Sequence, residues 1–154
     1  MAQFQRSATL DWTGDVVRGG GRVSAGSDAF TVTATFPRLR GEPAGTTTPE
    51  ELLAGSHATC FGIGLRSVLA QRGVSVSRVR VTATITAEKG DGRIRVVSAH
   101  LAASVEGATG VDVGALEEAA HEAERACTIS TLLRPTVPVS LEVRSGASSN
   151  SSAV

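Results

Sequence analysis

Residues 48–61 of this chain have the sequence Thr48-Pro49-Glu50-Glu51-Leu52-Leu53-Ala54-Gly55-Ser56-His57-Ala58-Thr59-Cys60-Phe61. Thr48 is a favourable N-cap, Pro49 occupies the first helical position, and Glu51 stands where a capping box has its acidic residue. The helical pattern continues to Arg72, after which Gly73 is placed to end it. Apolar residues surround this helix almost completely, so we expect it to be buried on nearly every side, by a sheet and by a further element or second subunit.

Strands are predicted both before and after this helix in the sequence. Residues 7–36 predict a β-meander, because the run 30–36 alternates apolar and polar side chains and turn residues precede it. Residues 37–47 contain two prolines and two glycines and predict a loop. Residues 78–86 and 94–105 predict a hairpin joined by a glycine-containing turn. Together with the helices, these strands indicate an α+β fold.

The last third of the chain predicts one more helix and one more strand. The helix spans Asp112 to Cys127, and residues 128–133 could add a short helical turn. Residues 137–143 predict a strand at a sheet edge, since Pro138 cannot donate a backbone hydrogen bond. We expect a single domain over residues 1–144, followed by a low-complexity, disordered tail at residues 145–154.

Composition excludes several classes of function. The chain has 154 residues with 15 basic and 15 acidic side chains, so no excess of positive charge favours binding to nucleic acid. We find no signal peptide and no apolar run long enough to span a membrane, which favours a cytoplasmic protein. The two cysteines lack the short spacing of a metal site and the three histidines are scattered, so we expect neither a metal nor a cofactor.

Cys60 and Cys127 lie on two separate helices, and each is either an inert small hydrophobe or half of a redox pair. Free thiols are more common than structural disulfides in the cytoplasm. For an isolated helical cysteine the inert alternative is the ordinary one. His57 precedes Cys60 by three residues, so a Cys–His pair is sterically feasible, although a half-buried helical histidine is the favoured interpretation.

A redox role for Cys60 would require a positive group near it. Cys60 lies twelve positions after the N-cap, whereas the helix dipole acts only over the first turn. Arg38 and Arg40 stand at the end of the predicted meander, just before the loop that leads into the helix. Glu50 has little structural reason to occupy the second helical position and could orient one of these arginines.

Residues 48–61 resemble the helix signature of the osmotically inducible protein C / organic hydroperoxide resistance (OsmC/Ohr) family. The segment 12–21 and His57 resemble the OsmC branch, and the similarity spans residues 7–144. The resemblance implies an intertwined homodimer in which antiparallel sheets wrap around long central helices. It also implies a thiol-dependent peroxidase with its active sites at the subunit interface.

The resemblance assigns roles to four residues. Cys60 matches the thiol that is oxidised by peroxide, Cys127 the thiol that resolves it as a disulfide, and Glu50 the family glutamate ten residues before the cysteine. Arg38 matches the family arginine, but the loop at 41–47 is longer than usual, which leaves Arg40 as an alternative. The expected partners are a hydroperoxide substrate and an external dithiol reductant. Organic hydroperoxides are expected to be preferred because of the candidate apolar surroundings of Cys60: Leu53, Phe61, Ile129 and Leu132.

Two other functions fit parts of the sequence. A thioesterase-like dimer also wraps a sheet around a central helix, but it requires an acid within that helix, and Glu50 and Glu51 stand only at its start. A non-enzymatic dimeric module that binds small molecules and contains inert thiols is the stronger alternative.

Overall fold

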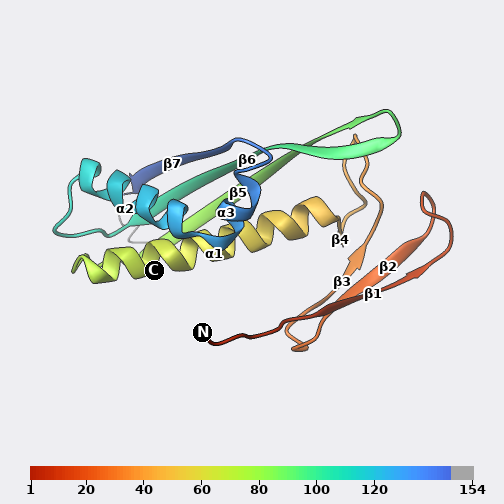
Figure 1. The fold of residues 1–154 in the computed structure, drawn as a ribbon, viewed down its shortest axis with the longest axis horizontal. Coiled ribbons are helices and arrows are strands. Elements are labelled where there is room, and N and C mark those ends of the chain that lie inside the picture. Colours follow the sequence, from red (N-terminus) through yellow and green to blue (C-terminus); the bar gives the residue numbers. More distant parts are fainter. Residues whose placement is uncertain (147–154) are drawn as a thin grey trace, which may run out of the picture. The chain divides into compact units, whose positions relative to one another are not determined.

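The computed structural model describes residues 1–146, and in that range the chain is α+β with two sheets and three helices (Figure 1). The elements are β1 (Ala8–Thr13), β2 (Gly20–Ala25), β3 (Thr31–Ala34), β4 (Thr46–Thr47), α1 (Pro49–Gln71), β5 (Arg78–Gly90), β6 (Arg93–Glu106), α2 (Val113–Ala126), α3 (Thr128–Leu133) and β7 (Val139–Gly146). The chain divides into two compact units, Met1–Leu52 and a second unit that starts at Leu53.

The first unit contains the predicted meander. Strands β1, β2 and β3 pair antiparallel in that order, with Leu10 opposite Val23 and Val23 opposite Val32. The sequence did not predict β4, which is two residues long and pairs parallel with β3 inside the segment expected to be a loop. A strand this short carries no alternating pattern, and the prolines and glycines around it indicate a loop.

The start of α1 confirms the predicted N-cap but changes the capping box. The Glu51 backbone N–H donates to the Thr48 hydroxyl over a long 3.4 Å. The Glu51 side chain accepts from the Thr47 hydroxyl at 2.5 Å, whereas a capping box predicts the backbone N–H of the N-cap as its donor. A threonine directly before the N-cap therefore takes the acid that was expected to complete the box.

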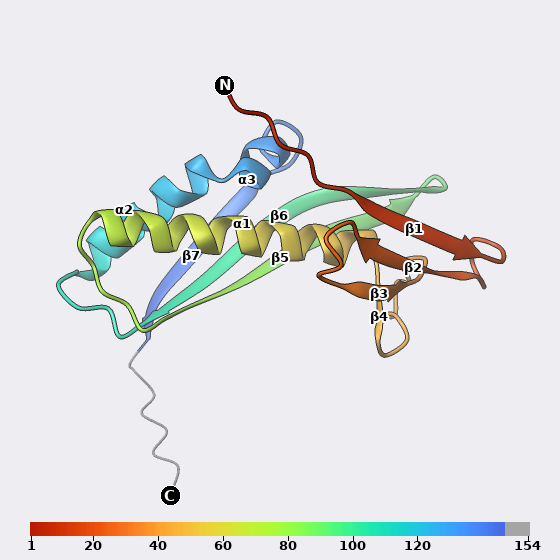
Figure 2. The ribbon, with the colours of Figure 1, turned by 90° about the horizontal axis from the view of Figure 1, so that it is seen from below.

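The second unit is built on a three-stranded sheet in the order β5–β6–β7 (Figure 2). Asp91 and Gly92 both have positive φ and form the tight turn of the predicted β5–β6 hairpin. Strand β7 lies at the edge, as predicted, but it pairs parallel with β6. The expectation of purely antiparallel sheets is therefore wrong, because the crossover through α2 and α3 allows a parallel pairing.

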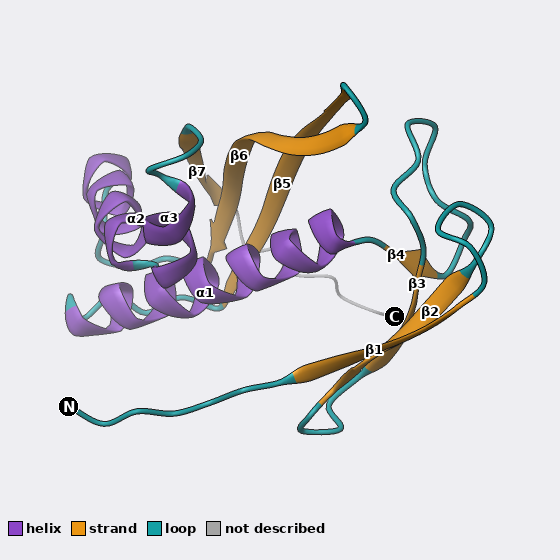
Figure 3. Cartoon of the chain, turned by 45° about the vertical axis from the view of Figure 1, so that its right-hand side comes forward, coloured by secondary structure: helices purple, strands orange, loops and turns teal. Residues whose placement is uncertain are grey.

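The three helices lie along one face of this sheet (Figure 3). Phe61, Leu65 and Leu69 of α1 are fully buried, and they join Leu101 and Leu116 in the core of the unit. Small residues fill the space between these larger side chains: Ala103, Ala119, Ala120 and Ala123. The core is therefore made of aliphatic side chains with one phenylalanine.

One side of α1 is exposed, which differs from the prediction of burial on nearly every side. Ile63 is 67% exposed, and only 28% of the most apolar 18-residue window of the helix is buried. By length and composition alone α1 could cross a membrane, which the sequence analysis did not expect of any segment, but a core helix satisfies the same criteria. A folded unit that leaves so much apolar helix uncovered has a surface suited to a partner.

Substitution at Gly73 tests how α1 ends. Gly73 has φ of +71°, and its N–H bonds to the Ala70 carbonyl while Val74 N–H bonds to that of Leu69. Gly73→Ala should lower the free energy of unfolding by about 1 kcal/mol, because a Cβ disfavours left-handed backbone. Urea denaturation measures this. Gly73→Asn is the matched control and should lose less, since asparagine tolerates this conformation; equal losses would contradict the explanation.

Candidate functional site: two thiols at the start of a short helix

The structure brings the two predicted redox residues together within the second unit. Cys60 lies on α1 and is half-buried, whereas Cys127 separates α2 from α3 and is 4% exposed. Both are free thiols, and the Cys127 side chain hydrogen-bonds to the Cys60 sulfur. Although they are far apart in sequence, the two thiols are therefore close enough for each to shift the pKa of the other.

The Cys60 sulfur accepts hydrogen bonds from the N-terminus of α3. Burial raises the pKa of Cys60, but hydrogen bonds from the Cys127 side chain, from the backbone of Ile129 and Thr128, and from the Thr128 hydroxyl outweigh it, so that the pKa is lowered. Thr128 and Ile129 are the first two residues of α3, whose N–H groups have no carbonyl partner within the helix. The Cys60 sulfur supplies the acceptor that these groups lack.

This arrangement corrects one step of the sequence analysis. Because Cys60 is too far from the start of its own helix, an arginine was expected to supply the positive field. A different helix supplies it: the N-terminus of α3 carries both free N–H donors and the positive end of a helix dipole. The groups that lower the pKa of Cys60 belong to Cys127, Thr128 and Ile129, and none of them is a cation.

The pKa of the second thiol, Cys127, is shifted in the opposite direction. Burial raises the pKa of Cys127, and the hydrogen bond and charge of Cys60 raise it further, while the backbone and hydroxyl of Ser130 lower it without reversing the direction. Cys127 is the N-cap of α3, but its sulfur makes no well-formed capping hydrogen bond. Cys60 therefore ionises more readily than an ordinary thiol, and Cys127 less readily.

His57 is fully buried, which differs from the half-buried position expected of it. Its Nε2 lies 2.8 Å from the Ser130 hydroxyl oxygen on α3, and its Nδ1 has no hydrogen-bond partner among the described residues. Burial lowers the pKa of His57 and outweighs the opposing charge of Glu124, so the ring is neutral. His57 bonds to the residue that contacts Cys127, and it is not among the groups that lower the pKa of Cys60.

The predicted arginines and glutamate belong to the first unit. Arg38 lies in an exposed turn, where its backbone N–H donates to the Glu42 carboxylate at 3.1 Å. Within the described residues neither Arg38 nor Arg40 forms an ion pair. One carboxylate oxygen of Glu50 is buried and has no hydrogen-bond partner in that part of the chain. The expected pairing of Arg38 with Glu50 is thus not formed in this single chain.

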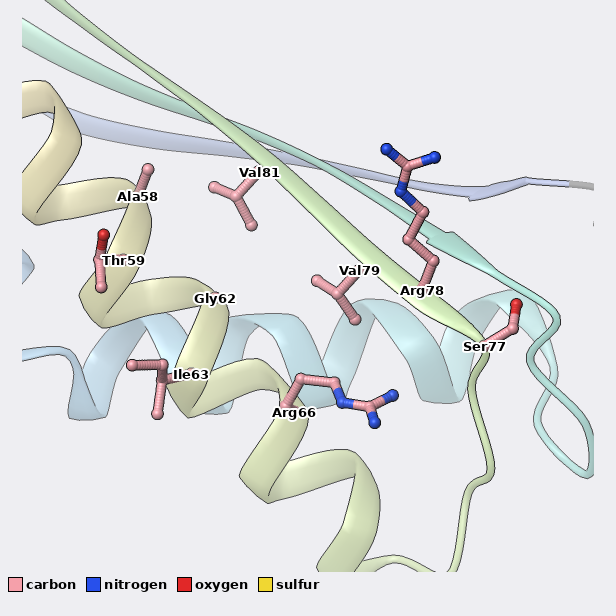
Figure 4. A pocket seen from close by; sticks show the side chains of 9 residues that line it. All are labelled: Ala58, Thr59, Gly62, Ile63, Arg66, Ser77, Arg78, Val79 and Val81. Carbon is pink, nitrogen blue, oxygen red and sulfur yellow. The ribbon is translucent and has the colours of Figure 1, made fainter.

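A groove of about 650 Å³ lies elsewhere in the second unit, between α1 and β5 (Figure 4). It is lined by Ala58, Thr59, Gly62, Ile63, Arg66, Ser77, Arg78, Val79 and Val81. Neither cysteine lines it. Because the groove is wide and open and lacks both thiols, we locate the reactive chemistry at Cys60 and interpret the groove as an uncovered packing surface.

Sequence analysis did not single out Thr128 and Ser130, which complete the site with Ile129, and it considered Ile129 only as an apolar neighbour of Cys60. One signal was present: residues 128–133 were expected to be a short helical turn directly after Cys127. A helix that begins next to one thiol offers its free N–H groups to any acceptor nearby. That the acceptor is Cys60 follows only from the packing of α1 beside α3.

Alkylation rates can test the assignment of donors. Cys60 should react with iodoacetamide at lower pH than an ordinary thiol, and Cys127 at higher pH, as measured by mass spectrometry of each labelled cysteine. Thr128→Val removes one hydroxyl donor and should slow alkylation of Cys60 at pH 7 by about threefold or more. Thr136→Val is the matched control, because that hydroxyl donates to the Leu133 carbonyl; an equal effect in both variants would refute the assignment.

Comparison with known proteins places this chain in a family. A model of the OsmC-like protein family matches residues 41–142, a region that crosses the boundary between the two units. Peroxiredoxin OsmC of Escherichia coli strain K12 is 27% identical over 142 residues, which cover 92% of this chain and 99% of that protein.

Solved structures agree at the level of the fold. An organic hydroperoxide resistance protein from Elizabethkingia anophelis has a TM-score of 0.76 at 22% identity, covering 94% of this chain and 99% of that one. An organic hydroperoxide resistance protein OsmC from Legionella pneumophila has a TM-score of 0.74 at 24% identity, with coverages of 93% and 98%. Since the family model matches well over half of its residues, this chain belongs to the OsmC-like protein family.

Proposed function

We propose that this protein is a thiol-dependent peroxidase that reduces organic hydroperoxides to alcohols. The observation that carries the proposal is a neighbouring pair of free thiols with opposite pKa shifts, Cys60 and Cys127. Its similarity to peroxiredoxin OsmC and to organic hydroperoxide resistance proteins supports the same chemistry.

The reaction proceeds in two steps at the protein. The Cys60 thiolate attacks the terminal oxygen of the hydroperoxide, an S–O bond forms, the O–O bond breaks, and the alkoxide takes a proton and leaves as the alcohol. Cys60 is then a sulfenic acid. Cys127 attacks its sulfur, the S–O bond breaks, and water leaves as the disulfide forms. An external dithiol reduces the disulfide and returns both thiols.

Thiolate formation alone contributes little to the rate. An ordinary thiol is only a few per cent ionised at pH 7, so full ionisation raises the thiolate fraction about thirtyfold. Nucleophilicity falls as pKa falls, which removes much of that gain. Most of the acceleration must therefore come from holding the peroxide in line and stabilising the departing alkoxide.

We assign alkoxide stabilisation to an arginine, Arg38, with Arg40 as the alternative. Support comes from Glu50, whose buried carboxylate oxygen lacks a partner among the described residues. A buried carboxylate oxygen without a partner is costly, so a cation is expected to join it in the working enzyme. A guanidinium held by Glu50 through two hydrogen bonds would be fixed in one orientation toward the peroxide.

The preference for organic hydroperoxides rests on apolar side chains near Cys60. Ile129 is half-buried and Leu132 is 68% exposed on α3. Both could contact the hydrocarbon part of a substrate, and Leu53 remains a further candidate. Phe61, which sequence analysis also considered, is fully buried in the core and is not available to a substrate.

We also propose that the enzyme is an intertwined homodimer. The exposed apolar side of α1 and the groove beside it provide the surface that a second copy would cover. Glu50 and Cys60 are ten residues apart on one helix, a rise of about 15 Å, so they cannot touch within that helix. A residue contributed by the partner subunit would bring the acid, the arginine and the thiol into one site. We further propose a single functional domain and a cytoplasmic location.

Thiol counting tests the peroxidase proposal. One equivalent of cumene hydroperoxide per chain should consume both thiols of the wild-type protein within one turnover. Cys60→Ser should abolish turnover, whereas Cys127→Ser should stop at a trapped sulfenic acid. Free thiols are counted by alkylation and mass spectrometry. Full retention of both thiols would instead favour the alternative, a dimeric module that binds small molecules and has inert thiols.

A charge on the exposed side of α1 tests the dimer. Ile63→Glu should convert the protein to monomers, because it replaces an exposed apolar side chain of the proposed contact with a charge, and activity should fall about tenfold or more with dissociation. Sedimentation velocity measures the mass. Val113→Glu is the matched control, since Val113 is similarly exposed, at 60%, outside the groove. A fully active Ile63→Glu monomer would disprove the requirement for a partner.

A further inference from the structure

A buried histidine and serine lie behind the resolving thiol, and the proposed reaction gives them no role. His57 and Ser130 are both fully buried, on α1 and α3 respectively. Their side chains meet at 2.8 Å between Nε2 and the hydroxyl oxygen. Ser130 lies three residues after Cys127, on the first turn of the same short helix. Such a pair could serve only to satisfy two buried polar groups, but its continuation to the thiol indicates more.

The number of hydrogens available fixes the direction of this chain of contacts. A serine hydroxyl has one hydrogen to donate, and a neutral imidazole carries one N–H. The Ser130 hydroxyl acts on the Cys127 sulfur as a donor. Its oxygen must then accept from His57, which places the ring hydrogen on Nε2 and leaves Nδ1 as a bare lone pair. Nδ1 is indeed buried without a partner among the described residues.

We propose that His57 and Ser130 are positioning residues that hold a hydroxyl hydrogen on the Cys127 sulfur, so that Cys127 can attack the oxidised Cys60. The order of donation is His57 Nε2–H to the Ser130 oxygen, the Ser130 O–H to the Cys127 sulfur, and the Cys127 S–H to the Cys60 sulfur. This inference rests on the proposed peroxidase function and deepens it by adding two residues to the second step.

The chain of donors matters most while the disulfide forms. In that step the S–H proton of Cys127 passes to the sulfenic hydroxyl of Cys60, the S–O bond breaks and water leaves, and the S–S bond forms. Negative charge develops on the Cys127 sulfur as its proton departs, in a site where that residue is 4% exposed. Water cannot readily stabilise this charge, so the Ser130 hydroxyl is placed to do so together with the backbone N–H of the same residue.

The surroundings leave few other groups to take this role. Among the described residues, the titratable groups that act on His57 and Cys127 are Cys60 on α1 and Glu124 on α2. Glu124 is 9% exposed and pairs with Arg134, just after α3, at 2.6 Å. The core-facing residues of β6 are apolar: Ala99, Leu101, Ala103 and Val105. Glu124 acts on the imidazole by charge alone and cannot donate to a thiolate.

The first experiment follows both thiols in a single turnover. Reduced protein is mixed with one equivalent of cumene hydroperoxide and quenched with N-ethylmaleimide at successive times, and mass spectrometry counts each free cysteine. Loss of the Cys60 thiol reports the first step, and loss of the Cys127 thiol reports the second. Ser130→Ala should slow the second step about tenfold or more, and His57→Leu about three- to tenfold, because the hydroxyl is no longer oriented. In both variants the Cys60 sulfenic acid should accumulate and be trapped by dimedone.

Two further measurements separate positioning from simple support of the fold. His57→Gln keeps an N–H close to the position of Nε2 and should restore most of the rate of the second step. The pH profile of Cys127 loss should move to higher pH in Ser130→Ala. His100→Phe is the matched control, since His100 forms a similar 2.8 Å bond to Ser140 on strands β6 and β7, and it should change neither step.

The outcomes distinguish the two proposals. If peroxide leaves the Cys60 thiol intact in the wild-type protein, the peroxidase function itself is wrong. If Cys60 is oxidised normally and Cys127 disappears at the wild-type rate in both Ser130→Ala and His57→Leu, the role given to His57 and Ser130 is wrong. A loss of the second step in His57→Leu that His57→Gln fails to restore would also overturn it.

Discussion

The site depends on one interaction: the Cys60 sulfur accepts the unpaired N–H groups at the start of α3. A helix N-terminus buried against apolar side chains needs an acceptor, and a thiol in such a place gains from being ionised. Each group therefore supplies what the other lacks. The contact also ties α1 to α3 beside Cys127, so the feature that ionises one thiol holds the second thiol next to it.

This interaction gives different roles to two side chains that are chemically identical. Burial acts on both sulfurs and raises the pKa of each, but only Cys60 has enough donors to reverse the effect. A peroxide arriving at the pair meets one sulfur that ionises readily and one that holds its proton more tightly. Cys127 keeps its proton until Cys60 carries a hydroxyl that can leave as water, which gives the proposed cycle a fixed order of steps.

Local sequence signals were sufficient for most of the elements. The N-cap at Thr48, the glycine end at Gly73 and the tight turn at Asp91 depend on neighbouring residues only, and all three are confirmed. Strand β4 was not predictable, because two residues carry no period. Parallel pairing of β7 was also missed, since the choice of neighbour depends on how the crossover packs rather than on the strand's own residues.

The tail was predicted to begin too early, at residue 145, because β7 extends through Gly146. Residues 147–154 lie outside the described part of the chain.

The site shows the same division between local and long-range information. Resemblance identified Cys60 and Cys127, but spacing along the chain could not reveal that residues 128–130 act on both sulfurs. The distance of Cys60 from the start of its own helix also led us to expect a cation near the thiol, whereas neutral N–H donors lower the pKa of Cys60. An arginine close enough to ionise the thiol would also be neutralised by it. Because α3 already performs that task, a guanidinium supplied by Arg38 or Arg40 would remain free to stabilise charge on the substrate, where the larger part of the rate acceleration is required.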